Sequence, residues 1–171
     1  MAAGFPKTVT KEFSPDTYAR CNHRAMIAVA AHLVFCGLFV RWPREDFRAD
    51  IRAGRETRDC IDEANSLITL DFQRHEAEIK EVWEYGARWP AAWDTVDIPG
   101  RKWKLKQDRT ALFFWIVSND LTHAWCVDGH RITSKHKGVK WNKAVGAEEE
   151  FMRVPTSVKW CKLIKLERMV K

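Results

Sequence analysis

The feature that most constrains the fold is the apolar run at residues 111–117, Ala-Leu-Phe-Phe-Trp-Ile-Val. A short, continuous apolar run rich in aromatic and β-branched residues is typical of a strand buried on both faces. The polar residues 118–120, Ser-Asn-Asp, then predict a turn, after which residues 122–127 return as a hairpin partner. The sequence therefore predicts a central strand over 111–117 with an antiparallel neighbour.

A long helix is predicted near the N-terminus, over residues 15–36. Ser14 is a good capping residue, Pro15 suits the first helical turn, and Asp16 is favoured by the helix dipole. Apolar residues then recur at helical spacing as far as Cys36, and Gly37 ends the helix. A short strand is expected next, over 38–42, stopped by a proline.

The remaining elements are short. Strands are predicted over 58–64, 66–74, 96–98, 102–106 and 158–166, a helix over 76–85, a loop or short helix over 44–58, and a basic loop over 129–147. Residues 1–13 form a loose polar lead-in. A long helix followed by several strands and one further helix predicts a single mixed α/β (α+β) domain over 14–171, built on a central mixed β-sheet.

Charge and cysteine usage indicate the class of partner and the compartment. The formal net charge of +6 favours a polyanionic partner such as nucleic acid. The five cysteines form no C-x-x-C pair, which fits a reducing cytoplasm better than a disulfide framework. The apolar run over 25–40 is interrupted by His32 and is shorter than the roughly 20 residues of a membrane span, so a buried helix is expected there.

The stretch from Arg58 to His75 is the candidate functional centre. Two apolar runs flank its midpoint, with Asp62 at the end of the first and Asp71 near the end of the second. A strand would place Asp71 and Gln73 on the same face. Mg²⁺ prefers oxygen ligands and takes one or two carboxylates, so Asp62 and Asp71 are candidate metal ligands. The alternative is an ordinary polar sheet edge.

The order of these elements resembles the PD-(D/E)XK, or restriction-endonuclease-like, nuclease superfamily. In that family a helix precedes a strand, an Asp lies on the next strand, and an acidic residue, any residue and a Lys follow. Asp62 would match the first Asp, and Asp71-Phe72-Gln73 the later triplet. The segment 111–127 also looks like the distal strands of phage-borne members.

The resemblance implies a deoxyribonuclease that depends on Mg²⁺ or Mn²⁺. Asp62 and Asp71 would hold the ion, and Gln73 would orient the attacking water. The departure from the family pattern is Gln73, which stands where Lys is usual and carries no charge. Either a neighbouring cation replaces that lysine, or the site is weak or silent.

Two further groups of residues are candidates for binding. Phosphate contact is predicted for basic residues of the 102–106 strand and the 129–147 loop, with one tryptophan stacking on unpaired bases: Lys102, Lys104, Lys106, Lys135, Lys137, Lys140 and Trp141. The alternative is a solvated basic face. A zinc site is a lesser hypothesis, on ligands of the right type at no recognised spacing: His123, Cys126, His130 and His136.

The leading expectation is therefore a metal-dependent nuclease-like domain that acts on DNA in the cytoplasm of the cell, or of the host cell if the chain is viral. Its alternative is a catalytically silent module that binds nucleic acid, or an inhibitor that works by contact with another protein. The sequence leaves a homodimer or a protein partner open.

Overall fold

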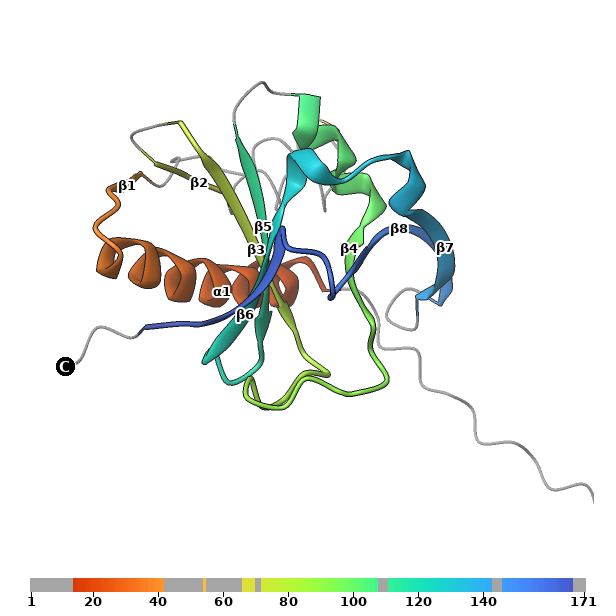
Figure 1. Ribbon diagram of the computed structural model, residues 1–171, viewed down its shortest axis with the longest axis horizontal. Helices are drawn as coiled ribbons and strands as arrows, with labels where there is room; N and C mark the ends of the chain where they lie inside the picture. Colours follow the sequence, from red (N-terminus) through yellow and green to blue (C-terminus); the bar gives the residue numbers. More distant parts are fainter. Residues whose placement is uncertain are drawn as a thin grey trace, which may run out of the picture.

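The computed structural model describes residues 14–41, 54, 66–69, 72–107, 111–142 and 146–167. The lead-in over 1–13 and the strand expected over 58–64 lie outside the described residues, and so does the 44–58 segment apart from Gly54. The described part is an α+β fold that contains a mixed sheet, which confirms the predicted class (Figure 1).

The long N-terminal helix is present as predicted. Helix α1 spans Pro15–Phe35, and the hydroxyl of Ser14 accepts a hydrogen bond from the Thr17 amide at 3.3 Å. Gly37 follows with φ of +84°, a conformation that favours glycine at a helix end. Buried side chains recur along one face of the helix: Asn22, Ala25, Met26, Val29 and Leu33. This face packs on the large sheet.

The large sheet of the described residues has six strands in the order β1-β2-β3-β5-β6-β9. Their bounds are β1 Val40–Arg41, β2 Ser66–Thr69, β3 Arg74–Lys80, β5 Leu112–Ser118, β6 His123–Asp128 and β9 Cys161–Lys165. The apolar run forms β5, which lies inside the sheet, parallel to β3 and antiparallel to β6. The predicted central strand and its hairpin partner are therefore confirmed.

Strand β3 replaces the helix that was predicted over 76–85, so that prediction is wrong. Side chains along Arg74–Lys80 alternate between the two faces of the sheet, as in a strand: Ala77 packs toward α1, whereas Glu76 and Glu78 point to the opposite face. All seven residues of β3 pair with β5. This pairing with the most apolar strand outweighs the weak helical spacing of the segment.

The strand predicted over 66–74 is divided by a turn. Phe72 has φ of +60°, and the Thr69 amide donates to the Gln73 carbonyl at 2.9 Å. The chain therefore reverses after β2 and continues as β3, antiparallel to it.

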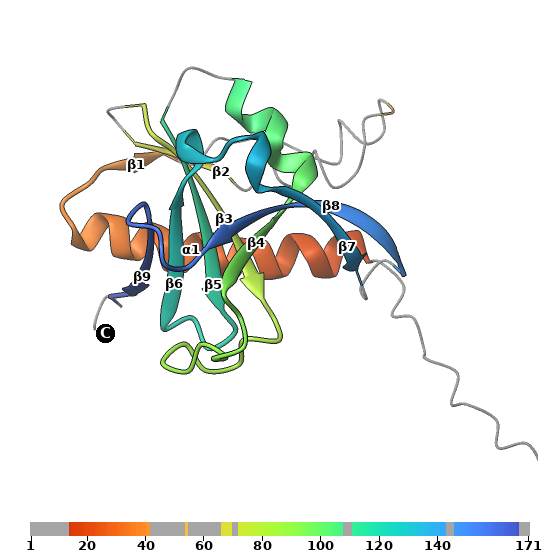
Figure 2. The same ribbon diagram turned by 45° about the vertical axis from the view of Figure 1, so that its right-hand side comes forward.

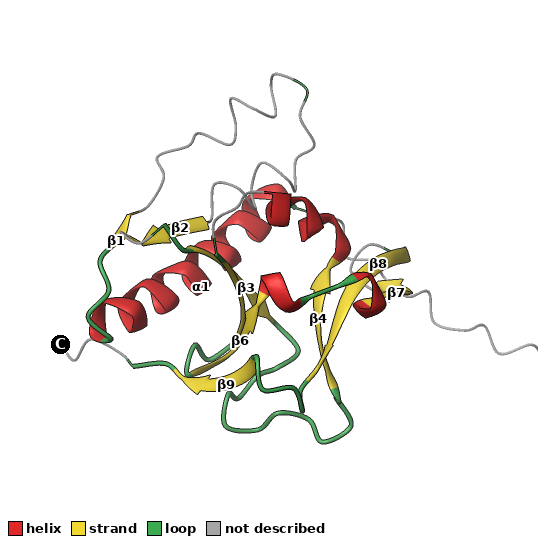
Figure 3. Ribbon diagram, turned by 45° about the horizontal axis from the view of Figure 1, so that its top comes forward, coloured by secondary structure: helices red, strands yellow, loops and turns green. Residues whose placement is uncertain are grey.

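A second sheet, of three strands among the described residues, lies against the face of the large sheet opposite α1 (Figures 1, 2 and 3). It has the order β4-β8-β7, with β4 Thr95–Pro99, β7 Lys137–Asn142 and β8 Ala147–Pro155. Strand β4 confirms the expectation for 96–98. The loop predicted over 129–147 is wrong in part, because it contains two single-turn 3₁₀ helices and β7.

The strand predicted over 102–106 is also wrong. These residues belong to the 3₁₀ helix η1, Gly100–Gln107, which begins directly after β4. Lys102 and Leu105, three residues apart, are both buried, as the three-residue period of a 3₁₀ helix requires. The alternation of lysines with apolar residues is typical of a half-buried strand, but here these residues form a 3₁₀ helix.

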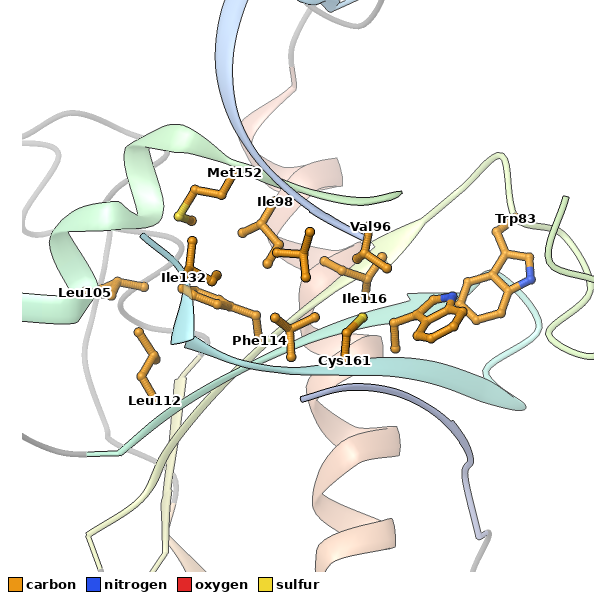
Figure 4. Close-up of a cluster of buried hydrophobic side chains, with 13 residues drawn as sticks. Trp83, Val96, Ile98, Leu105, Leu112, Phe114, Ile116, Ile132, Met152 and Cys161 are labelled. Carbon is orange, nitrogen blue, oxygen red and sulfur yellow. The ribbon is translucent and has the colours of Figure 1, made fainter. Parts of the chain in front are cut away.

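The apolar core has two parts, one on each face of the large sheet. Alternate side chains of β5 enter each: Trp115 and Val117 face α1, whereas Phe114 and Ile116 face the small sheet. Figure 4 shows the second part, in which β4 and β8 contribute Val96, Ile98 and Met152. Within the described residues, none of the helices has the length and apolarity needed to cross a bilayer.

Candidate active site

The predicted metal ligands Asp62 and Asp71 lie outside the described residues, so their arrangement stays a prediction. Gln73 is half-buried directly before β3. Its main-chain amide donates to the Thr69 hydroxyl at 3.1 Å, and its carbonyl closes the turn between β2 and β3. The main chain of Gln73 therefore stabilises this turn through its hydrogen bonds with Thr69.

Strand β3 brings together a second set of charged residues close by. Glu76, Glu78 and Lys80 alternate along it and therefore share one face. The Lys102 ammonium reaches this face from η1, with its nitrogen 2.5 Å from a carboxylate oxygen of Glu76 and 2.5 Å from one of Glu78. Glu76 and Lys102 are fully buried, and the Glu78 side chain is 14% exposed.

The place of this cluster follows from the pairing of β3. Among the described residues, β2 pairs with β3 from Arg74 to Glu76, and the pairs given for this edge do not reach Glu78 or Lys80. The start of α1 approaches the same cluster: the Arg101 guanidinium donates to the Tyr18 hydroxyl at 2.5 Å. Three elements, α1, β3 and η1, thus meet around the carboxylate pair.

The electrostatics of the cluster favour the ionised form of Glu78. Burial alone would raise the pKa of its carboxyl group, since desolvation disfavours a charge. The positive charge of Lys102 and its hydrogen bond oppose this effect, with smaller contributions from Arg101 and Lys80, so the pKa lies below its ordinary value. The Glu78 carboxylate is therefore held ionised, with Lys102 as its main positive partner.

These residues are not among those predicted from the sequence, although the sequence contains a signal for them. Glu78-Ile79-Lys80 is an acidic residue, any residue and a lysine, which is the triplet that was sought at Asp71. It includes the lysine that Gln73 cannot supply. In the helix predicted over 76–85, residues 78 and 80 do not share a face, so this prediction hides the triplet.

The basic residues predicted to contact phosphate fall into different environments. Lys102 is buried in ion pairs and is not exposed for phosphate contact. Lys106 donates to the Ile132 carbonyl, and its ammonium lies 4.2 Å from the ring centroid of Trp103. Lys104 is half-buried in η1.

The basic residues of the second sheet are partly paired. Lys140 forms an ion pair with Asp97, and Lys137 lies 3.2 Å from Glu150. Lys135 is exposed in a 3₁₀ turn, and the Trp141 side chain is 60% exposed on β7. Contact of these residues with nucleic acid stays a prediction.

The zinc hypothesis is not favoured by the fold. No group of three or more His, Cys, Asp or Glu side chains that could hold a metal occurs among the described residues, which include all four proposed ligands. The His136 ring packs edge-on against Trp160 at 5.4 Å, and its Nδ1 accepts from the Thr133 amide. Burial raises the pKa of the Cys126 thiol to about 12, which disfavours the thiolate that zinc requires.

Comparison of the chain with protein-family models, with curated proteins and with solved structures finds no match. The cluster around Glu76, Glu78, Lys80 and Lys102 is therefore the feature of the described residues from which a function can be inferred.

Proposed function

We propose that the chain is a metal-dependent nuclease that cleaves phosphodiester bonds in DNA, with its centre on Glu76, Glu78 and Lys80. The observation that carries this proposal is the shared face of the three residues, with both carboxylates directed at one buried cation. The positive net charge of +6 supports a polyanionic substrate.

The residues suit the chemistry. Two carboxylates are the ligand set that Mg²⁺ or Mn²⁺ commonly takes from a protein, with water and phosphate oxygens completing the shell. Such an ion, when bound, lowers the pKa of a bound water and neutralises charge on the phosphate. Lys80, half-buried beside the carboxylates, is placed to act as a point charge toward the phosphate or the attacking water. Asp62 and Asp71 remain further candidate ligands.

A second candidate function is a catalytically silent module that binds nucleic acid. One observation favours it: the Lys102 ammonium already neutralises both carboxylates, in the position where a metal ion would otherwise bind. A permanent lysine there would leave the fold intact and remove the need for a metal.

Cleavage of labelled linear and circular DNA, with Mn²⁺ or Mg²⁺ and then with EDTA, tests the proposal. We expect cleavage with the metal and none in EDTA. Glu78→Gln and Lys80→Met should each lower the rate at least about 100-fold, which corresponds to about 2.7 kcal/mol of transition-state stabilisation. Glu84→Gln is the matched control, because Glu84 is an exposed acidic residue that follows β3.

The two functions give different results in the same experiment. DNA binding that persists in EDTA, with no cleavage under any metal, would reject the nuclease and support the silent module. Cleavage that Glu78→Gln and Lys80→Met leave unchanged would move the active centre away from β3. A salt-insensitive affinity for DNA would argue against both functions, because phosphate contacts release counterions.

A further inference from the structure

Strand β7 is the outer strand of the small sheet among the described residues and exposes two large apolar side chains to solvent. In the order β4-β8-β7, it has a neighbour among the described residues only on its β8 side. Val139 and Trp141 on this strand are 64% and 60% exposed. Figure 1 shows β7 beyond β8, at the side of the molecule remote from β1. An exposed, apolar edge strand is a template for pairing with another strand.

We propose that β7 pairs with the β7 strand of a second copy of this chain and so forms a symmetric dimer with a continuous six-stranded sheet. This proposal goes beyond the nuclease function and does not depend on it. Two-fold pairing of an edge strand is antiparallel and isologous, so every contact occurs twice. The same face of both small sheets then lies on one side of the joined sheet.

The sequence of β7 is complementary to itself in one register. When Val139 lies opposite Val139 of the second copy, Lys137 lies opposite Trp141 and Gly138 opposite Lys140. The two Val139 side chains meet at the two-fold axis, and the aliphatic stem of Lys137 packs on the tryptophan ring, while its ammonium keeps Glu150 and the Trp103 ring of its own copy. No lysine faces a lysine, and five of the six residues of the strand are paired.

The neighbouring registers are less favourable. A shift that centres the pairing on Lys140 places two Lys140 ammonium groups directly opposite each other, which is destabilising. A shift that centres it on Gly138 leaves only residues 137–139 paired within the strand and takes Trp141 out of the contact. A shift of one β7 strand by an odd number of residues relative to the other would pair residues whose side chains lie on opposite faces of the sheet. The Val139-centred register is therefore the one that the strand supports.

Charges beside the edge are compatible with this pairing. Lys140 pairs with Asp97, which Arg153 shares, and Lys137 pairs with Glu150, all within the same copy. Each lysine of the edge strand therefore has a carboxylate of its own copy beside it, which limits its repulsion of a second copy. An oligonucleotide, by contrast, would meet the exposed carboxylates of Glu148 and Glu150 beside Trp141. This arrangement favours a second copy over nucleic acid as the partner of this edge.

Disulfide trapping tests the register. Directly opposed residues in an antiparallel pair have Cα atoms about 4.5–5.5 Å apart, which suits a disulfide. In a Cys36→Ser background, which removes an exposed thiol, Val139→Cys should give a covalent dimer under mild oxidation. Lys137→Cys alone should not, whereas Lys137→Cys combined with Trp141→Cys should. Val82→Cys, at a position 67% exposed, measures collisional cross-linking.

Solution mass gives an independent test with the full chain. Sedimentation over a concentration series should approach twice the 20.0 kDa mass of one chain. Val139→Lys should weaken the association at least about tenfold, because it places two ammonium groups on the two-fold axis, whereas Val82→Lys should leave it unchanged. Circular dichroism establishes that each variant is folded.

The proposal is overturned by any of three results: Val139→Cys cross-links no faster than Val82→Cys, the Val139→Lys chain dimerises as well as the parent, or the parent remains monomeric at every concentration. Quenching of tryptophan fluorescence by an oligonucleotide in a monomeric chain, if Trp141→Phe abolishes it, would also overturn the proposal and would assign this edge to nucleic acid.

Discussion

The ammonium nitrogen of Lys102 lies 2.5 Å from a carboxylate oxygen of Glu76, and neither side chain is exposed to solvent. The two residues are 26 positions apart and join η1 to the centre of β3. Burying one charge costs several kcal/mol, and a partner of opposite sign offsets this cost only in good geometry. Glu78 provides a second carboxylate to the same ammonium, so the cation is shared.

Lys102→Met should destabilise the chain by about 3–5 kcal/mol in EDTA, because it leaves two neighbouring buried carboxylates without their cation. If the carboxylate pair is a metal site, Mn²⁺ should restore part of this stability, since an ion that binds only the folded state stabilises it. Thermal unfolding with and without Mn²⁺ measures both effects. The rise in Tm on addition of Mn²⁺ should be larger for the variant than for the parent.

Lys159→Met, at an exposed position, is the control for this comparison and should change neither quantity. An equal rise in Tm for parent and variant would mean that metal and Lys102 do not compete for Glu76 and Glu78. No rise in either protein would count against the metal site.

The stability of the chain should fall in acid because of Glu78. Its pKa is below the ordinary value of about 4.3 when folded, so the folded state binds its proton less readily than the unfolded state. The contribution is fully present above about pH 4.3 and is lost as the pH falls through the folded pKa. Urea denaturation between about pH 7 and about pH 3 measures the slope.

Glu78→Gln should make the free energy of unfolding depend less on pH in the acid range, even though this variant is less stable than the parent at neutral pH. Glu84→Gln should keep the slope of the parent, since Glu84 is exposed and outside the cluster. If Glu78→Gln and the parent lose stability in parallel, the ionised carboxylate of Glu78 contributes nothing to the acid dependence.

Asp120→Ala should destabilise the chain by about 3 kcal/mol, because it leaves several donors around one turn without their acceptor. The Asp120 carboxylate accepts from the Gly86 amide at 3.1 Å, the Ser118 hydroxyl at 2.7 Å and the Thr122 hydroxyl at 2.8 Å. These bonds, which overcome the effect of partial burial, lower the pKa of Asp120. The urea midpoint measures the loss. Asp94→Ala, at an exposed aspartate, should change the free energy of unfolding by less than about 0.5 kcal/mol.

The elements with strong local signals were predictable from the sequence. Helix α1 has a capping serine and a terminal glycine, and β5 has a continuous apolar run. Strand β3 was not predictable in this way, because its polar face is satisfied by Lys102 of η1, which lies 24 residues or more away. Local periodicity carries no information about such a partner, and pairing with β5 outweighs it.

The candidate site also depends on contacts between distant residues. The carboxylate pair expected at Asp62 and Asp71 stays a prediction, because both residues lie outside the described ones, whereas the structure shows Glu76 and Glu78 of β3 paired with Lys102. The sequence pattern at 102–106 suggested exposed lysines on a strand, yet Lys102 is buried in η1. Lys102 can reach Glu76 and Glu78 because η1 begins directly after β4, which packs on the same face of the large sheet. Asp62 and Asp71 remain predictions that mutation can test.

Among the described cysteines, Cys126 and Cys161 should resist alkylation in the native state while Cys36 reacts rapidly. Burial raises the pKa of both Cys126 and Cys161 to about 12, and a thiol reacts as its thiolate. Cys36 is exposed at the end of α1. Brief treatment with iodoacetamide at about pH 8, near the ordinary thiol pKa of about 8.5, followed by mass spectrometry of the peptides, measures each rate. In urea all three should react at similar rates, which controls for differences between peptides. Native alkylation of Cys161 as fast as that of Cys36 would mean that β9 opens readily and does not hold its place beside β6.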